Sequence, residues 1–421
     1  MTMRMTGLLD CNNFYVSRER VFDPSLNDRP VAVLSNNDGS CISRSNEFKA
    51  LDLPKRIPYY LLKRYADELG IVFRSSNYCL YGDMSNRVMN VLRDMVPQIE
   101  QYSIDESFFH MDFAAGFDYA AFGAAIRKKV LRWTGIPCGI GFAKTKTLAK
   151  IANHIGKKTA SGIFVMPEDP LPILRELPLT EVWGISWRLE KQLLALGIRN
   201  AGELAECESG DIRRKFSVSL AQTVLELQGV PAIAHDDFGG PAQRIGFSRS
   251  FGAPTASTEA IRESVMHYTA VAAEKLRALH EAASCIYIYA HYTAEYGGSE
   301  KLPSGYCGHV AAFPVPLAEH ISMTRYIAPA IRHIIVLGRK AMKTGVVLFE
   351  LTGDDSTDAD LFERSDERNL ALAEAMDSIN HRYGRNTLFL AGEGIKREWS
   401  MKRNFLSRRF TTCWDELPEV K

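Results

Sequence analysis

The sequence has no CxxC pair among its 8 cysteines, no apolar run of membrane-spanning length and no visible internal repeat. Without cysteines at metal-ligand spacing, a zinc site has no local support, and we expect small buried thiols. A membrane-spanning helix needs about 20 consecutive apolar residues, so we expect none. The stretch 1–9 is too short and too lightly apolar for a secretory signal. We therefore predict a cytoplasmic protein.

The sequence also has almost no net charge, with a formal value of +1 over 421 residues. This balance argues against a purely electrostatic nucleic-acid binder. Local clusters of Lys and Arg, within 144–158 and 396–409, still allow local contacts with nucleic acid. A chain of this length predicts three or four domains rather than one core.

Hydrophobic periodicity predicts a mixed α/β first part, up to residue 168. The expected strands are 7–10, 30–34 and 138–143, the expected helices are 43–51, 79–95, 119–134 and 145–154, and a hairpin is expected from 99–104 and 107–111. A helical segment follows over 169–236. Residues 244–353 return to α/β in a βαβ-βαβ order, and a basic, aromatic tail with a helix at 368–383 ends the chain.

Three carboxylates are the most informative side chains. Asp10 follows the apolar run 7–9, and Asp105 and Glu106 lie near the bend of the predicted hairpin. A single Asp at a strand end is commonly a cap or turn residue, but an adjacent Asp-Glu in apolar surroundings is costly to bury without partners. Adjacent strand residues point to opposite faces, so the backbone must deviate there. We predict that the three converge and bind Mg²⁺, which prefers hard oxygen ligands.

Five residues are candidates for contact with a nucleotide. Phe14 and Tyr15 would form a wall beside the metal, with core packing as the competing interpretation, and the ring of Tyr15 could exclude a 2′-hydroxyl. Asn46 and Lys49 share one face of the predicted helix 43–51, and Lys157 follows the helix 145–154. These three could hold a triphosphate, whereas a solvated face is the alternative.

The turn at 182–186 lies between helices and contains Gly184, Ile185 and Ser186. Backbone N–H groups at such a helix start can hold a DNA phosphate without reading sequence. A plain helical hairpin is the alternative.

Together, these segments resemble the Y-family translesion DNA polymerases, and more narrowly the UmuC branch with its plasmid-borne relatives. The motifs that carry the resemblance are 10–15, 35–39, 81–85, 103–107 and 141–150. The tail segments 382–385, 399–401 and 406–412 are similar to the C-terminal extension of the UmuC branch.

The resemblance implies a multidomain α/β (α+β) fold of the right-hand polymerase type. A ferredoxin-like palm, small fingers, a helical thumb with a helix-hairpin-helix, and a βαβ-βαβ little finger are expected. The implied boundaries are 1–22 and 78–168 for the palm, 23–77 for the fingers, 169–236 for the thumb, 237–243 for a linker, 244–353 for the little finger and 354–421 for the extension.

The resemblance also implies roles for individual residues. Asp10, Asp105 and Glu106, with the carbonyl of Cys11, would hold two Mg²⁺ ions, and Tyr15 would be the steric gate. The incoming nucleotide would contact Phe14, Asn46, Lys49 and Lys157, and DNA would contact the turn at 184–186 and Arg249. Leu361 and Phe362 end a degenerate clamp-binding peptide, in which Asp358 replaces the usual Gln.

The sequence therefore predicts a template-directed, error-prone DNA polymerase acting in translesion synthesis during the SOS response. The resemblance implies a processed UmuD dimer and a RecA filament as partners, with the sliding clamp as a further one. Two alternatives remain open from the residues: a nucleotidyl cyclase, which needs no duplex grip, and a non-catalytic DNA-binding factor at stalled forks.

Overall fold

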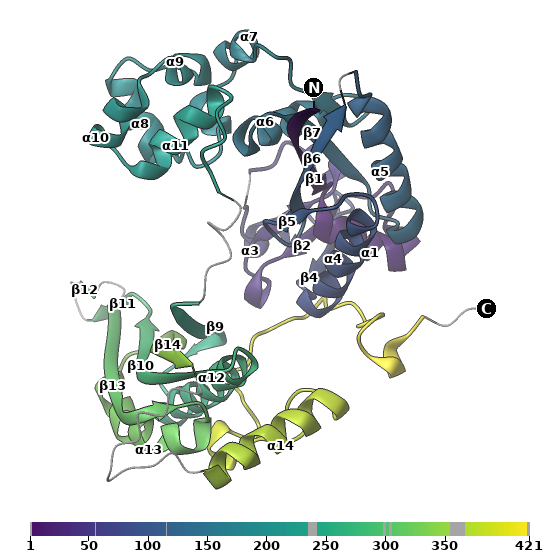
Figure 1. Ribbon diagram of the computed structural model, residues 1–421. Helices are drawn as coiled ribbons and strands as arrows, with labels where there is room; N and C mark the ends of the chain where they lie inside the picture. The colour runs from purple at the N-terminus through teal and green to yellow at the C-terminus, as the bar shows by residue number, and fades with distance from the viewer. Residues whose placement is uncertain are drawn as a thin grey trace. The chain divides into compact units, whose positions relative to one another are not determined.

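A computed structural model describes residues 2–54, 56–114, 116–234, 242–297, 300–302, 305–353 and 367–418 (Figure 1). The chain folds into two compact units. Unit 1 comprises Met1–Ser35, Gly39–Gly240 and Phe405–Lys421, and unit 2 comprises Asn36–Asp38 and Pro241–Asn404. In the described residues, no helix is long and apolar enough to cross a membrane.

A five-stranded sheet in the order β5-β6-β1-β7-β8 is the centre of unit 1. Its strands are Ile99–Gln101 (β5), Glu106–Ala114 (β6), Thr2–Cys11 (β1), Cys138–Ala143 (β7) and Ile163–Val165 (β8). The central strand β1 pairs antiparallel with both β6 and β7. The sheet is therefore fully paired where β1 carries Asp10 to its end.

Helices cover both faces of this sheet. Successive side chains of a strand point to opposite faces, so neighbouring residues of β1 pack in two different cores. Leu9 packs in a core with α4 (Tyr78–Arg93) and α5 (Tyr119–Thr134). Its neighbour Leu8 packs in a second core with α6 (Lys146–Gly156). A strand buried on both faces is continuously apolar rather than alternating, which explains the run before Asp10.

The helix α6 lies very close to β7 at Gly141. A Cβ at that position would overlap the backbone of α6 at Ala149 and Asn153. Glycine is thus required there for close approach rather than for a turn. The tight contact fixes the helix that carries Lys150.

The segment 31–75 forms a small three-stranded sheet in the order β3-β2-β4, with Val31–Leu34 (β2), Cys41–Arg44 (β3) and Val72–Ser75 (β4). The predicted helix 43–51 is wrong at its start, since Cys41–Arg44 pairs with β2 as a strand. The helix α2 covers only Asn46–Lys49, and Ser45 caps it by accepting a hydrogen bond from the N–H of Phe48. A further α-helix of this segment is α3 (Tyr59–Leu62), and α1 (Phe14–Phe22) precedes the segment.

The segment 171–227 is helical, as predicted. Its helices are Leu171–Arg175 (α7), Trp187–Ala195 (α8), Ala201–Ala205 (α9), Ser209–Lys215 (α10) and Val218–Leu227 (α11). They share a core with α6, so this part packs directly on the sheet of unit 1.

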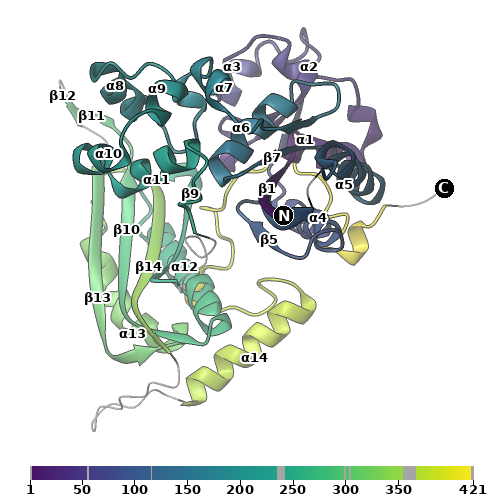
Figure 2. The ribbon, with the colours of Figure 1, turned by 45° about the horizontal axis from the view of Figure 1, so that its top comes forward.

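Unit 2 is built on a four-stranded antiparallel sheet in the order β13-β10-β14-β9. The strands are Arg244–Thr255 (β9), Glu281–Tyr292 (β10), Gly305–Leu317 (β13) and Ala341–Gly353 (β14). Helices α12 (Thr258–Ala278) and α13 (His320–Ala330) lie on one side of this sheet (Figure 2). A short hairpin, Glu295–Gly297 (β11) with Glu300–Leu302 (β12), was not predicted.

The end of the chain is shared between the two units. The helix α14 (Glu367–Tyr383) and Trp399 belong to unit 2, where Trp399 is part of the core. Residues 405–418 belong to unit 1. The predicted βαβ-βαβ order and the helix near the C-terminus agree with the structure, whereas the return of the chain to unit 1 was not predicted.

Candidate active site

The strand pairing brings the three predicted carboxylates to one edge of the unit 1 sheet. Asp10 is the register partner of Glu106 across β1 and β6. The N–H of Cys11 donates to the carbonyl of Asp105 at 2.9 Å. The thiol of Cys11 is buried in the core, so only its backbone faces the other groups.

A tight turn allows Asp105 and Glu106 to share one site although they are adjacent. The hydroxyl of Ser103 accepts from the N–H groups of both, at 3.2 and 3.0 Å, and donates to the Asp105 carboxylate at 2.7 Å. Asp105 therefore lies before the regular strand, which begins at Glu106. The alternation of a strand does not apply between them.

Two lysines face these carboxylates. The ammonium of Lys157 lies 2.5 Å from an oxygen of Asp10, and that of Lys150 lies 2.7 Å from an oxygen of Glu106. Lys150 comes from α6 and was not among the predicted site residues. The sequence signals for it are its place in the basic cluster within 144–158 and in the 141–150 motif.

The surroundings of Asp10 make its ionisation costly. Burial raises the pKa of Asp10 to about 7, Lys157 opposes this shift, and the nearby charges of Glu106 and Asp105 add to it. Such a cluster requires positive charge to stay ionised at neutral pH. The two ammonium groups supply part of it.

A cavity of about 380 Å³ opens at this edge of the sheet. It joins the carboxylates to the helical segment of unit 1. Its lining includes Asp10, Glu106, Lys150, Asn153, Lys157 and Trp183–Ile185. Trp183 donates from its ring N–H to the hydroxyl of Tyr102 at 3.1 Å, which fixes one wall.

Phe14 and Tyr15, the two adjacent aromatic residues of α1, lie in different environments. Phe14 is buried in the core, which favours the packing interpretation for this residue. Tyr15 is half-buried, and the charge of Asp105 contributes to its raised pKa after burial and Tyr78. Tyr15 is thus the ring that lies near the carboxylates.

Asn46 and Lys49 are joined through a residue that sequence reasoning missed. Asn13 donates to the Asn46 side chain at 2.9 Å and accepts from the Lys49 ammonium at 2.6 Å. It stands at the N-cap position of α1 in a left-handed conformation with φ of 46°, which Asn tolerates better than most residues. The sequence signal that could have indicated this residue is the position of Asn13 directly before Phe14 and Tyr15.

Gly184 and Ile185 of the turn at 184–186 line the cavity, whereas Ser186 does not. Gly184 has φ of +88° with open space around its Cα. The side chain of Ile185 is buried and its N–H donates to Val182 at 3.1 Å. Ser186 caps α8 by accepting from the N–H of Leu189. Exposed Gly184 and the start of α8 are therefore the parts free to meet a phosphate.

Arg249 belongs to unit 2, where its guanidinium lies 5.1 Å from the ring centroid of Phe247. That ring packs on Tyr268 of α12, so Arg249 lies on the helix-covered face of the sheet. The predicted clamp residues Leu361 and Phe362 lie outside the described residues.

The open face of the unit 2 sheet carries an aromatic group that was missed. Ile286 and Ile288 of β10 are buried under the helices, so the alternating positions face away from them. Four rings gather there, with centroids 4.8–6.5 Å apart: Tyr287, Tyr289, His291 and Tyr306. The alternation of Tyr287 and Tyr289 was the signal in the sequence.

The carboxylate oxygens of Asp10, Asp105 and Glu106 at the sheet edge are of the ligand type that a hard divalent cation such as Mg²⁺ prefers. Across the ranges that the structure describes, no three His, Cys, Asp or Glu side chains form a metal-binding group. Lys157 and Lys150 engage oxygens of Asp10 and Glu106 instead, and a bound cation would have to displace them.

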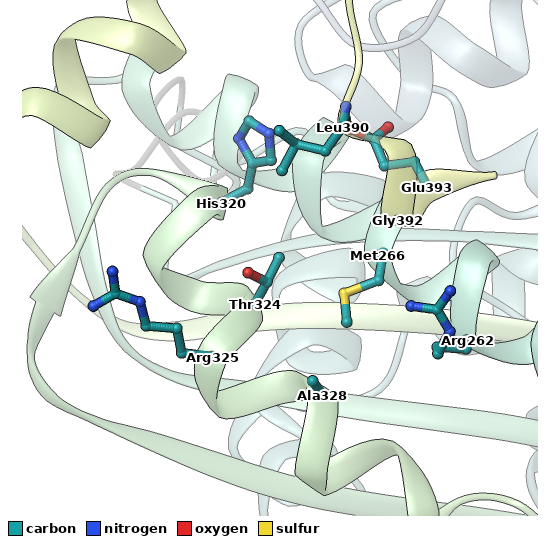
Figure 3. Close-up of a pocket in the computed structure, with 9 residues that line it drawn as sticks. All are labelled: Arg262, Met266, His320, Thr324, Arg325, Ala328, Leu390, Gly392 and Glu393. Atoms are coloured by element: carbon teal, nitrogen blue, oxygen red, sulfur yellow. Dashed lines mark hydrogen bonds between the residues drawn. The ribbon is translucent and has the colours of Figure 1, made fainter. Parts of the chain in front are cut away.

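A second cavity, of about 300 Å³, lies within unit 2 (Figure 3). Its walls come from α12, α13 and residues 390–393. Its lining residues include Arg262, Met266, His320, Arg325, Leu390 and Glu393. The Glu393 carboxylate is already held by the ring of His267 at 2.8 Å and the N–H of Leu390 at 2.9 Å. This cavity therefore has no cluster of free carboxylates.

Family comparisons cover most of the chain. Residues 9–154 match the impB/mucB/samB family, and residues 242–361 match the C-terminal domain of that family. Residues 371–420 match a domain of unknown function, DUF4113.

Two full-length relatives come from enterobacteria. The chain is 38% identical over 427 residues to the protein UmuC of Salmonella typhimurium, covering 99% of this chain and 100% of the relative. It is 35% identical over 424 residues to the protein MucB of Escherichia coli, covering 98% and 99%. A DNA polymerase IV of Bacillus subtilis is 30% identical over 216 residues, or 50% of this chain and 51% of that protein.

The fold is similar to solved Y-family polymerases. A Y-family DNA polymerase chimera of Dbh and Dpo4 superposes with a TM-score of 0.64 at 19% identity, covering 83% of this chain and 99% of the other. An insertion ternary complex of Dbh DNA polymerase gives 0.52 at 18% identity, with the same coverage. The expected right-hand polymerase fold is thus confirmed. With its full-length match to UmuC and MucB, the chain belongs to the impB/mucB/samB family of Y-family DNA polymerases.

Proposed function

We propose that this protein is a template-directed, error-prone DNA polymerase for translesion synthesis in the SOS response. The observation that carries the proposal is the edge of the unit 1 sheet. There, Asp10 and Glu106 are register partners, Asp105 lies in the turn just before Glu106, and two lysines line the cavity. Such a cluster suits nucleotidyl transfer to a primer 3′-hydroxyl.

Two Mg²⁺ ions would be held by Asp10, Asp105, Glu106 and the carbonyl of Cys11. When bound, they supply a lowered pKa for the attacking hydroxyl and neutralise charge on the phosphates. The protein's part is to keep the three carboxylates ionised and aligned. Ser103 does this for Asp105 by donating a hydrogen bond at 2.7 Å.

The remaining residues position the substrates. On release from Asp10, the ammonium of Lys157 can pair with the triphosphate of the incoming nucleotide, with Lys49 and Asn46 at its other side. The ring of Tyr15 would lie under the sugar and leave no room for a 2′-hydroxyl. Gly184 and the start of α8 would hold a DNA phosphate by backbone groups.

Contacts of unit 2 with DNA form a further part of the proposal. The rings of Tyr287, Tyr289 and Tyr306 offer a group of aromatic side chains on the open face, whereas Arg249 lies on the covered face. Residues 1–22 and 78–168 would then act as palm, 23–77 as fingers, 169–236 as thumb and 244–353 as little finger. We further propose a cytoplasmic site of action with a processed UmuD dimer, a RecA filament and the sliding clamp as partners.

The decisive variant is Asp105→Ala with Glu106→Ala. We expect it to lose primer extension by at least about 10³-fold, because the developing charge loses its stabilisation. Extension of a labelled primer across an abasic template measures this, with accessory subunits present. Binding to primer–template DNA in a gel shift should remain.

The matched control is Asp94→Ala with Glu168→Ala, which removes two exposed carboxylates of unit 1 whose side chains are 54% and 90% exposed. Its extension should equal that of the wild type. A double mutant at 105 and 106 that still extends primers would reject the site and favour the non-catalytic binding factor. Cyclic product from a nucleotide without DNA would favour the cyclase.

A further inference from the structure

The segment after residue 404 packs on β4 and α1 of unit 1. Phe405 exchanges hydrogen bonds with Ser75, since its carbonyl accepts from the Ser75 N–H at 2.9 Å and its N–H donates to the Ser75 hydroxyl at 3.0 Å. Phe410 stacks on Phe22 of α1 with centroids 4.9 Å apart. The segment is thereby fixed at both ends, with Ser407 between them.

Ser407 reaches a buried carboxylate. Its hydroxyl donates to an oxygen of Glu19 at 3.0 Å, and the hydroxyl of Tyr81 donates to the same oxygen at 2.7 Å. Glu19 and Tyr81 have almost no exposed surface. A buried carboxylate is costly unless it is hydrogen-bonded, so both donors stabilise Glu19. Because the two hydroxyls donate to the same oxygen, Glu19 connects the position of Ser407 to that of Tyr81.

Tyr81 connects this carboxylate to the predicted steric gate. Its ring stacks on that of Tyr15 with centroids 4.6 Å apart and an interplanar angle of 15°. Tyr15 and Glu19 lie four residues apart on α1, hence on one face of the helix. Tyr81 is therefore held at its hydroxyl by Glu19 and in turn supports the ring of Tyr15.

A second contact links the segment to the helix that bears Tyr81. Asn77 caps α4 by accepting from the N–H of Leu80. Its amide group donates to the carbonyl and the hydroxyl of Ser407, at 3.2 and 3.1 Å, and to the carbonyl of Arg408 at 3.2 Å. The same segment thus contacts both elements that position the two stacked rings.

We propose that the C-terminal segment, through Ser407, Glu19 and Tyr81, positions Tyr15 and so sharpens selection of deoxyribonucleotides. The proposal rests on the proposed function, in which Tyr15 excludes the 2′-hydroxyl. A steric gate discriminates only if its ring cannot yield, and small displacements in a site change rates strongly. It gives part of the domain of unknown function at 371–420 a role in substrate choice.

The test measures kcat/KM for a dNTP and for the matching rNTP on one primer–template, with the full chain and its accessory subunits. Tyr81→Phe keeps the stacked ring but removes its bond to Glu19, and Ser407→Ala removes the donor from the segment. We expect the dNTP/rNTP ratio to fall about three- to tenfold in each, the usual effect of one lost hydrogen bond. Any loss of folded protein cancels in this ratio.

The matched controls are Tyr78→Phe, which removes a phenol beside the same rings but leaves Glu19 bonded, and Thr412→Ala, which removes an exposed hydroxyl of the same segment. Both should keep the wild-type ratio. In a Tyr15→Ala background, Tyr81→Phe and Ser407→Ala should change the ratio no further, because they act through Tyr15.

Three outcomes would overturn the positioning role, and one of them would also overturn the gate. If Tyr15→Ala lowers the ratio but Tyr81→Phe and Ser407→Ala do not, the positioning role is wrong and the gate stands. The same holds if both lower the ratio equally with and without Tyr15. If Tyr15→Ala itself leaves the ratio unchanged, the gate is rejected, and the positioning proposal with it.

Discussion

At the scale of single residues, the candidate site combines three carboxylates with two lysine ammonium groups. Asp10, Asp105 and Glu106 gather negative charge in a partly buried place, and Lys157 and Lys150 offset it. An ammonium that pairs with a carboxylate in the absence of substrate is well placed to pair with a triphosphate once cations bind the carboxylate. Lys157 therefore has two successive partners in the proposed mechanism.

This arrangement predicts the effect of Lys157→Met. The variant should raise KM for the incoming dNTP about tenfold, since a charge-assisted contact to phosphate is lost. Steady-state insertion of one nucleotide measures it. Lys158→Met removes the neighbouring exposed charge and is the control. Equal effects of the two variants would mean that only general electrostatic attraction is involved.

The convergence of the carboxylates could be predicted from residues, and their counterions could not. An apolar run before Asp10 and a bend at Asp105 indicate strand ends, which a sheet brings to one edge. The pairing of Lys150 with Glu106 depends on how α6 crosses the sheet, which no local pattern reveals. The burial of Ile185 could not be predicted either, because it depends on the packing of the helical segment.

At the scale of elements, the position of α6 depends on one glycine. A Cβ at Gly141 would overlap the helix backbone, whereas nothing lies within 4 Å of a Cβ at Gly82 on α4. The two positions therefore differ in what an added methyl group does, although both are glycines in regular structure.

We expect Gly141→Ala to lower the free energy of unfolding of unit 1 by about 2–3 kcal/mol, as overpacking does. Gly82→Ala should raise it by up to about 1 kcal/mol through helix propensity. Urea denaturation of the full chain, followed by far-UV circular dichroism, compares them. A Gly141→Ala protein as stable as the wild type would show that α6 can shift freely on β7.

Most elements followed from hydrophobic period, and the failures have physical causes. The helix α5 and the strand β7 have the predicted bounds, since caps and breakers frame them. The start of the predicted helix 43–51 became β3, because Cys41–Arg44 finds a partner in β2. Tertiary pairing overrides local preference in so short a segment.

At the scale of the whole molecule, unit 1 is built from segments that are far apart in the sequence. It leaves unit 1 after residue 240 and returns at Phe405. There, Phe405 packs edge-on against Tyr59 and near Phe73, with centroids 5.5 and 6.0 Å away. The core of the small sheet is thus completed by a residue more than 300 positions later.

Phe405→Ala should therefore destabilise unit 1 by about 1–3 kcal/mol, less than the ~3–5 kcal/mol for a fully buried aromatic side chain, because Phe405 is only partly buried. Hydrogen exchange of the amides in β4 should accelerate, while amides of β10 in unit 2 keep their rates. Leu406→Ala, which shortens a neighbouring side chain that is 40% exposed, is the control. Equal acceleration in both units would contradict the assignment of Phe405 to unit 1.

The segment from Phe405 on also determines when unit 1 can be completed during synthesis of the chain. A ribosome releases Glu19, Ser75 and Asn77 long before it makes Ser407 and Phe405, their partners in the finished protein. Glu19, Ser75 and Asn77 therefore lack these partners until synthesis has passed residue 407. Truncated translation products should consequently be trapped with an incomplete first unit, which makes them natural targets for chaperones and proteases.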